Sequence, residues 1–249
     1  MLSKSQINLF KSLQHKKFRT EHGLFLVEGH KSINEFANSA YQLDTVYQTY
    51  TTDPKLLNLS HKTNSQQISL NDLEKISGLK TPQDAVALVK IPSWPALNTD
   101  VLRKSFALVL DGVQDPGNMG TIIRTADWFG ISNIICSDDT VDAYNPKVVQ
   151  ATMGSLSRVR VHYLNLESFL PKAGVPIYGA LLNGKNIYTT DFGTEGLIVM
   201  GNEGNGIRPV IEKLVTKAIT IPRAGQAESL NVGIATAIFC SEIKRNKFK

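Results

Sequence analysis

Three segments in the second half of the chain place polar side chains in glycine-rich turns that follow apolar runs. The first extends from Leu110 to Gly130 and contains Asn118 and Arg124 where the turn continues into a helical pattern. Glycines in such a turn let a ligand or another segment approach the backbone closely. Asn118 either caps the helix or belongs to a site. We expect Arg124 at a buried helix start, where its permanent charge needs an anionic or carbonyl partner.

The second segment, residues 196–209, is an apolar run that ends in a glycine-dense loop. Pro209 occupies the last position of a possible dinucleotide-binding fingerprint, which requires glycine or alanine there, so the fingerprint fails. The sequence also contains no G-x-x-x-x-G-K-[ST] phosphate-binding loop, which argues against nucleoside triphosphate chemistry. Glu203 stands between Gly201 and Gly204, either as a loop-surface acid or as part of a site.

The third segment, residues 219–240, contains an apolar run that stops at Pro222, then a loop and a helix rich in small residues from about Val232. Ser229 and Asn231 are both good N-cap residues, and capping alone explains either one. Two polar side chains and free backbone amides at one helix start also form a binding platform. The residues themselves leave both interpretations open.

A parallel sheet is the framework that can bring the three segments together. Short apolar runs predict buried strands at 106–110, 133–136, 159–163, 177–181, 197–200 and 218–221. The helical patterns between them predict helices that begin near Met119, Pro146, Glu167, Arg208 and Val232. This alternation is typical of an α/β protein whose largely parallel sheet is covered on both faces, with ligands beyond the carboxyl ends of the strands.

Residues 1–95 are predicted to form a separate, small α/β domain. It contains a helical pattern at residues 33–40 and apolar runs at 24–27 and 85–91. Prolines and small polar residues then predict a linker at 96–105, which leaves 106–249 for the second domain.

Composition narrows the class of protein further. The 249 residues are 42% hydrophobic and 20% charged, and no apolar stretch is long enough to span a membrane. The start of the chain lacks the layout of a secretory signal, and the two cysteines lie far apart without metal-ligand spacing, so we expect a cytoplasmic protein with reduced thiols. The net charge of +5 favours a polyanionic partner. Basic residues cluster near both ends, as a nucleic-acid surface or as solvated charges: Lys11, His15, Lys16, Lys17, Arg19, Lys244, Arg245, Lys247 and Lys249.

Together, the three segments resemble the three motifs of the SpoU (TrmH) family of RNA ribose 2′-O-methyltransferases, within the SPOUT superfamily. The matching features are N-x-x-x-x-x-R at Asn118 to Arg124, an apolar strand into G-N-E-G at 201–204, and I-P plus S-L-N between Ile221 and Asn231. The resemblance covers most of residues 105–245. Residues 17–29 and Thr81-Pro-Gln83 likewise resemble the start and end of the family's L30e-like RNA substrate-binding domain.

The resemblance implies a SPOUT-type α/β domain with a C-terminal trefoil knot, a homodimer, and S-adenosylmethionine as the cofactor, with no metal. It assigns the cofactor contacts, with Ile221 and Leu230 as walls for adenine, to Leu181, Met200, Gly201, Asn202, Gly204, Ile221 and Leu230. It assigns the catalytic roles to Asn118, Arg124, Glu203, Ser229 and Asn231.

The family pattern makes Arg124 the residue that acts on the ribose 2′-hydroxyl. A guanidinium resists deprotonation, so we expect Arg124 to clamp a phosphate or stabilise the emerging alkoxide while a phosphate oxygen or water accepts the proton. Asn118 would orient the arginine or the ribose, and Glu203 would hold Arg124 or the motif loop. The remaining two polar residues would fix the cofactor loop and the substrate.

The N-terminal domain is expected to recognise structured RNA, ribosomal rather than transfer RNA, through Lys16, Lys17, Arg19 and Lys31. One alternative is a catalytically inactive RNA-binding ribosome-assembly factor of the same fold, against which the intact polar set argues. Another is a base methyltransferase of the same superfamily, which the arginine and the S-L-N pattern disfavour.

Overall fold

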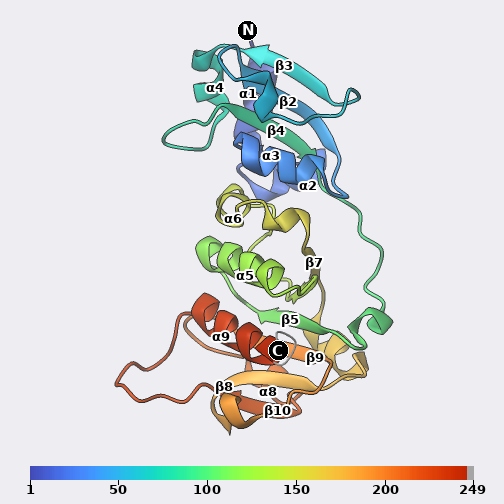
Figure 1. Ribbon diagram of the computed structural model, residues 1–249, viewed down its shortest axis with the longest axis vertical. Helices are drawn as coiled ribbons and strands as arrows, with labels where there is room; N and C mark the ends of the chain where they lie inside the picture. The colour runs from blue at the N-terminus through green and yellow to red at the C-terminus, as the bar shows by residue number, and fades with distance from the viewer. Residues whose placement is uncertain (246–249) are drawn as a thin grey trace. The chain divides into compact units, whose positions relative to one another are not determined.

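The computed structural model, shown in Figure 1, describes residues 1–245, so Lys247 and Lys249 of the C-terminal basic cluster lie outside the described residues. The chain forms two compact units. One contains residues 1–94 and 142–158, and the other contains 95–141 and the chain from 159 onward. The sequence assigned 142–158 to the second domain, whereas this segment packs with the N-terminal residues.

The N-terminal unit contains a mixed four-stranded sheet in the order β1-β4-β2-β3. β4 pairs antiparallel with β1 and with β2, and β2 pairs parallel with β3. Its strands are β1 (Leu24–Glu28), β2 (Leu43–Thr49), β3 (Asn64–Ile68) and β4 (Ala85–Lys90). Its helices are α1 (Lys4–Ser12), α2 (Lys16–His22), α3 (His30–Ala37), α4 (Leu70–Ile76) and α6 (Pro146–Ala151).

Aromatic packing holds the segment 142–158 within this unit. The ring of Tyr144 lies 4.8 Å from that of Phe25 on β1, and Phe25 packs edge-on against Phe36 of α3 at 5.5 Å. α6 also contacts β1. The second core of the unit lies between the sheet and the helices α1 and α4, where Phe10 and Leu73 meet side chains of β1, β2 and β4.

The second unit contains a six-stranded sheet in the order β10-β8-β9-β5-β6-β7, with every neighbouring pair parallel. The prediction of an α/β fold with a parallel sheet is therefore confirmed. The strands are β5 (Phe106–Asp111), β6 (Asn133–Cys136), β7 (Arg160–Tyr163), β8 (Ile177–Asn186), β9 (Gly196–Gly201) and β10 (Lys217–Thr220). The helices are α5 (Pro116–Trp128), α7 (Leu166–Phe169), α8 (Pro209–Glu212) and α9 (Val232–Lys244).

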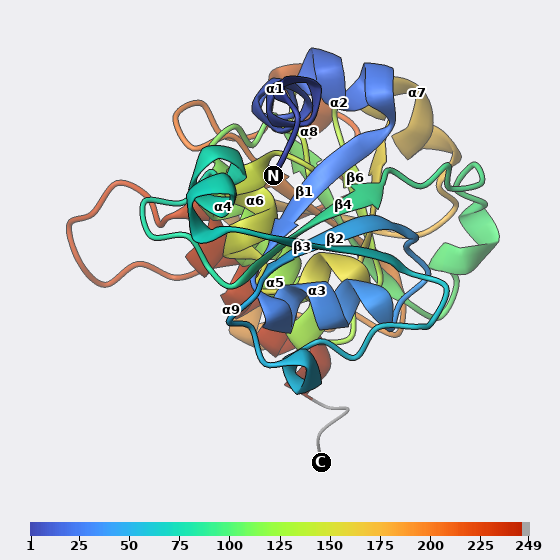
Figure 2. The ribbon, with the colours of Figure 1, turned by 90° about the horizontal axis from the view of Figure 1, so that it is seen from above.

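Helices cover both faces of this sheet, and for that reason the central strands are apolar throughout. Ala107 and Val109 of β5 pack in one cluster with residues of α7 and α8. Leu108 and Leu110 point to the opposite face because successive side chains alternate across a strand. α5 and α9 lie side by side within this unit (Figures 1 and 2), and α9 also contacts β9. Among the described residues, no helix has the length and apolarity needed to cross a membrane.

β8 is interrupted where it passes β10. The pairing with β10 jumps from Gly179 opposite Ala218 to Lys185 opposite Ile219, so residues 180–184 bulge out of the strand. A Cβ on Gly184 would lie 2.6 Å from the carbonyl carbon of Ala218, so only glycine permits this approach. The bulge contains Leu181, a predicted cofactor contact, whose partly buried side chain packs against the core of this unit.

Candidate active site

The three motif segments follow three strands of the same parallel sheet. β5 ends at Asp111 and pairs there with Gly201, the last residue of β9, so their carboxyl ends lie side by side. The loop after β9 closes on itself through an isolated bridge between Asn202 and Gly206. The third loop runs from β10 to α9 and projects at the left of Figure 1.

Glu203 connects the second segment to the first. Its carboxylate accepts hydrogen bonds from the Asn118 Nδ2 at 3.0 Å and from the backbone N–H groups of Asp115 at 3.2 Å and Gln114 at 3.3 Å. Partial burial opposes ionisation, but these hydrogen bonds outweigh it and hold the pKa of Glu203 below its ordinary value. Glu203 was expected to hold either Arg124 or the motif loop. Its hydrogen bonds go to the first motif loop.

Asn118 and Asn231 connect the first segment to the third. The Asn231 Nδ2 donates to the Asn118 Oδ1 at 2.8 Å, while the Asn231 Oδ1 caps α9 by accepting from the backbone of Gly233 and Ile234. Asn118 does not cap α5, because Asp115 is the N-cap and accepts from the Asn118 backbone N–H at 2.8 Å. Glu203, Asn118 and Asn231 therefore form one hydrogen-bonded chain across all three segments.

Ser229 is not a helix cap, contrary to one of its two interpretations, because Asn231 alone fills that position. Ser229 lies in the exposed loop 222–231 and has no hydrogen bond with the described residues. In the same loop Leu230 is 50% exposed, and Ile221, directly after β10, is half-buried. The two expected adenine walls are thus both accessible.

Arg124 is exposed, so the expectation of a buried helix start is wrong. α5 begins at Pro116 rather than near Met119, which puts Arg124 in its third turn. Thr121, Arg124 and Trp128 recur every three to four residues along the outer face of α5, and Trp128 is 83% exposed. The backbone of Arg124 is about 9 Å further along the helix axis than that of Asn118, since each helical residue rises about 1.5 Å.

The predicted cofactor residues of the second motif form a tightly packed turn. The Asn202 side chain donates to the Gly112 carbonyl at 2.7 Å and accepts from the Gly204 backbone at 2.9 Å. A Cβ on Gly201 would lie 2.2 Å from the carbonyl carbon of Gly206. The side chain of Met200 is buried in the core, so only its backbone can reach a ligand.

An ion pair beneath the second motif loop was missed in the sequence analysis. Asp111 is fully buried and accepts from the Arg208 backbone at 2.8 Å and from its Nε at 2.7 Å. This hydrogen bonding to Asp111 raises the pKa of Arg208. An aspartate that ends an apolar strand and an arginine directly before Pro209 are the signals that could have suggested it. In the part of the chain that the structure describes, no group of three metal-ligating side chains occurs.

Three of the four predicted RNA-binding residues lie at the surface of the N-terminal unit. Lys16, Lys17 and Lys31 are exposed. The prediction that Arg19 contacts RNA is wrong. Its guanidinium is buried and donates to Asp142 at 2.6 and 2.9 Å and to the Leu13 carbonyl at 2.8 Å. Arg19 therefore fixes the segment 142–158 and is not available to an RNA phosphate.

The parallel sheet and the hydrogen bonds that join Glu203, Asn118 and Asn231 are those of a methyltransferase of the SPOUT class. The comparisons with known proteins support the same class. Residues 105–241 match the model of the SpoU rRNA Methylase family, and residues 4–87 match that of an MRM3-like substrate binding domain. The chain belongs to the SpoU rRNA methylase family, as the three motifs indicated.

Individual relatives match over nearly their whole length. The 23S rRNA (guanosine(2553)-2′-O)-methyltransferase RlmP of Bacillus subtilis is 32% identical over 241 residues, covering 94% of each chain. A TrmH-family structure from Porphyromonas gingivalis has a TM-score of 0.89 at 38% identity and covers 99% of both chains. The AdoMet-bound rRNA methyltransferase from Sinorhizobium meliloti has a TM-score of 0.88 at 28% identity, covering 99% of this chain and 96% of its own.

Proposed function

We propose that this protein transfers a methyl group from S-adenosylmethionine to a ribose 2′-hydroxyl of structured ribosomal RNA. The observation that carries the proposal is the hydrogen-bonded chain of Glu203, Asn118 and Asn231, which fastens the three motif loops at one edge of the sheet. Family membership supports the chemistry, and the name of the Bacillus relative supports ribosomal RNA as the substrate class.

The loops beyond β8, β9 and β10 provide the cofactor site in this proposal. The backbone of Leu181 and of residues 200–204 would hold the cofactor, with Ile221 and Leu230 against the adenine. Their accessible apolar surfaces fit a flat aromatic ring, which supports this assignment. When bound, S-adenosylmethionine supplies an electrophilic methyl group. The chain supplies the alignment of the ribose oxygen with that group, which accounts for much of the acceleration.

Arg124 is the residue that we assign to the reacting ribose. It stays protonated, so it stabilises the developing alkoxide or holds an adjacent phosphate, and a phosphate oxygen or water accepts the proton. Asn118 and Asn231 act as positioning residues. The hydrogen bond between their side chains holds the first motif segment against the third. Ser229, exposed in the same loop as Leu230, is free to contact cofactor or substrate.

We further propose a trefoil knot and a homodimer in which Arg124 serves the partner's site. Contacts of α9 with α5, with β9 and with the turn Ile187–Thr189 support a chain that passes beneath the connection between β8 and β9. The exposed position of Arg124, about two turns beyond Asn118, supports a role in another subunit. Exposed apolar side chains of the same unit, Leu230 and Ile234, support an interface.

The domain assignment is part of the same proposal, with one change: residues 1–95 together with 142–158 bind RNA, 96–105 link the two domains, and the rest of 106–249 catalyses. The separate matches at 4–87 and 105–241 support it. Lys16, Lys17 and Lys31 would contact RNA phosphates. We place the activity in the cytoplasm, since the buried thiols of Cys136 and Cys240 are unpaired.

The test combines cofactor binding with turnover on deproteinised 23S ribosomal RNA. The protein should bind S-adenosylmethionine in a calorimeter, and Arg124→Ala should keep that affinity while kcat falls by about 10²- to 10³-fold. A matched Arg103→Ala variant, at an exposed arginine of the same unit outside the motif loops, controls for loss of surface charge. A protein that binds the RNA but no S-adenosylmethionine would instead be an assembly factor, and the proposal would fail.

A further inference from the structure

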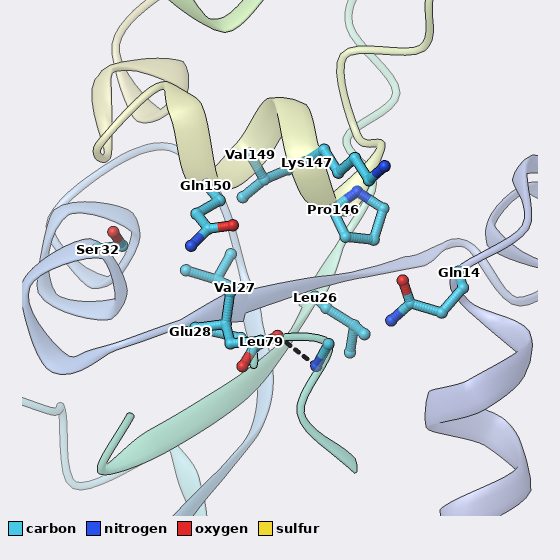
Figure 3. Close-up of a pocket in the computed structure, with 11 residues that line it drawn as sticks. Gln14, Leu26, Val27, Glu28, Ser32, Leu79, Pro146, Lys147, Val149 and Gln150 are labelled. Carbon is cyan, nitrogen blue, oxygen red and sulfur yellow. Dashed lines mark hydrogen bonds between the residues drawn. The ribbon is translucent and has the colours of Figure 1, made fainter. Parts of the chain in front are cut away.

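A pocket in the N-terminal unit lies beside β1, the edge strand of its sheet. Figure 3 shows its walls, which come from β1, from the turn between α1 and α2, from the loop after α4 and from α6. Leu26 and Val27 of β1, Pro146 of α6 and Leu79 supply apolar surface. Edge-strand backbone groups are open to pairing, so this position combines apolar walls with hydrogen-bonding capacity.

Gln14, Glu28 and Gln150 are among the polar side chains that line this pocket, and they come from different segments. Gln14 and Gln150 are exposed, and Figure 3 shows their amides on opposite sides of β1. Glu28 is anchored, because its carboxylate accepts from the Ser77 hydroxyl at 2.5 Å and from the Gly78 backbone at 2.9 Å. Each carboxylate oxygen can accept a further hydrogen bond, and each amide can both donate and accept. This set matches the mixed donor and acceptor edge of a nucleobase.

Exposed lysines occur close in sequence to residues from several walls of the pocket. Each stands next to, or within three residues of, a lining residue: Lys16 and Lys17 follow Gln14, Lys31 precedes Ser32, Lys80 follows Leu79, and Lys147 itself lines the pocket. Positive charge near a binding site attracts phosphates through the release of counterions. The combination of an amide-lined slot with basic surroundings distinguishes a nucleotide from an uncharged small molecule or an acidic peptide.

We propose that this pocket receives the base of one unpaired nucleotide of the substrate RNA, with the neighbouring phosphates held by the lysines. The inference rests on the proposed function, since it names how the RNA-binding unit selects its substrate. Unpaired loop bases expose their hydrogen-bonding edges, whereas an A-form duplex presents mainly its backbone. The pocket therefore makes the unit selective for loops.

The test measures the binding of two fluorescein-labelled RNAs to the full-length protein by anisotropy. One is a hairpin whose unpaired loop contains all four bases, and the other is a blunt duplex of equal length. Replacing both glutamines, Gln14→Ala with Gln150→Ala, should weaken hairpin binding about 30-fold, since two hydrogen bonds of about 1 kcal/mol each are lost. Duplex binding should stay unchanged. Gln67→Ala, an exposed glutamine on β3 of the same unit, is the matched control and should bind both RNAs as the wild type does.

Two outcomes would contradict the proposal that this pocket binds a base. Either the double variant binds the hairpin as tightly as the wild type, or the wild type binds hairpin and duplex equally. Both can be distinguished from failure of the proposed function, because S-adenosylmethionine binding and methyl transfer to ribosomal RNA are measured on the same preparations. Unchanged duplex binding by the double variant also shows that the N-terminal unit is folded.

Discussion

Glu203 carries its charge at the surface of the molecule and yet behaves as a fixed group. One side-chain amide and two backbone N–H groups converge on its carboxylate, and all three come from the first motif segment. Such a carboxylate orients its donors as much as they orient it. Asn118 thereby gains a defined rotamer and presents its oxygen to Asn231. At the scale of single residues, Glu203 fixes Asn118, and Asn118 in turn fixes Asn231.

This arrangement predicts how stability depends on pH. The pKa of Glu203 is lower in the folded chain than its ordinary value of 4.5, so the carboxylate stabilises the fold fully above about pH 4.5 and loses this effect as the pH falls through the folded pKa. At neutral pH, Glu203→Gln should lower the free energy of unfolding, and the difference from wild type should shrink in acid.

Urea unfolding between pH 3 and pH 7 measures this difference. Glu212→Gln, an acid in the first turn of α8 in the same unit whose side chain has no hydrogen bond or ion pair with the described residues, is the control for a general loss of negative charge. A gap between Glu203→Gln and wild type that stays constant across the range would contradict the account.

At the scale of elements, the apolar strands of the second unit were predictable and the polar ones of the first were not. β5 and β9 are buried on both faces and appear as uninterrupted apolar runs. β3 has the sequence Asn-Ser-Gln-Gln-Ile and buries only Ile68, because it is an edge strand whose position depends on β2. Its pattern alone therefore resembles a loop.

The same limit applies to the site. Glycine-rich turns after apolar strands predicted that the loops of Glu203 and Asn231 lie together, and both residues do bond Asn118, since strand ends of a parallel sheet share one edge. The exposure of Arg124 depends on where α5 begins, and Pro116 with the Asp115 cap sets that start one turn earlier than the apolar pattern indicated. The burial of Arg19 depends on Asp142, a residue 123 positions away, which no local pattern reveals.

The turn after β9 yields a prediction for this element. Gly201→Ala forces a methyl group against the backbone of Gly206 and Ile207, so the free energy of unfolding should fall by about 1–3 kcal/mol and S-adenosylmethionine binding should weaken. Gly225→Ala is the control, because no atom lies within 4 Å of the added carbon. Equal stability of the two variants in chemical denaturation would refute the close packing of this turn.

At the scale of the whole molecule, some basic residues stabilise the fold and others are exposed to a partner. Arg19 is consumed in a buried ion pair, whereas the lysines around the N-terminal pocket are exposed. The net charge of +5 alone indicates attraction to polyanions without saying where they bind. The exposure of the lysines, set against the burial of Arg19, supports our proposal that they provide that attraction.

Replacing Lys31, Lys80 and Lys147 by glutamine should therefore change the salt dependence of RNA binding. Each lost phosphate contact lowers the slope of log K against log salt by about 0.7 on single-stranded RNA, so the triple variant should lose about two units of slope. A second triple variant at Lys4, Lys55 and Lys62, which are exposed in the same unit away from the pocket, has the same net charge. If both variants show the same slope, net charge alone would explain the binding.

The central claim is that the three joined loops direct a methyl group to a sugar oxygen. The most direct measurement uses S-adenosylmethionine with a radioactive methyl group, purified 23S ribosomal RNA, and alkaline hydrolysis of the product. A methylated ribose cannot cyclise onto its phosphate, so the label should appear in an alkali-stable dinucleotide. Label released in mononucleotides would mean methylation of a base and would contradict the account.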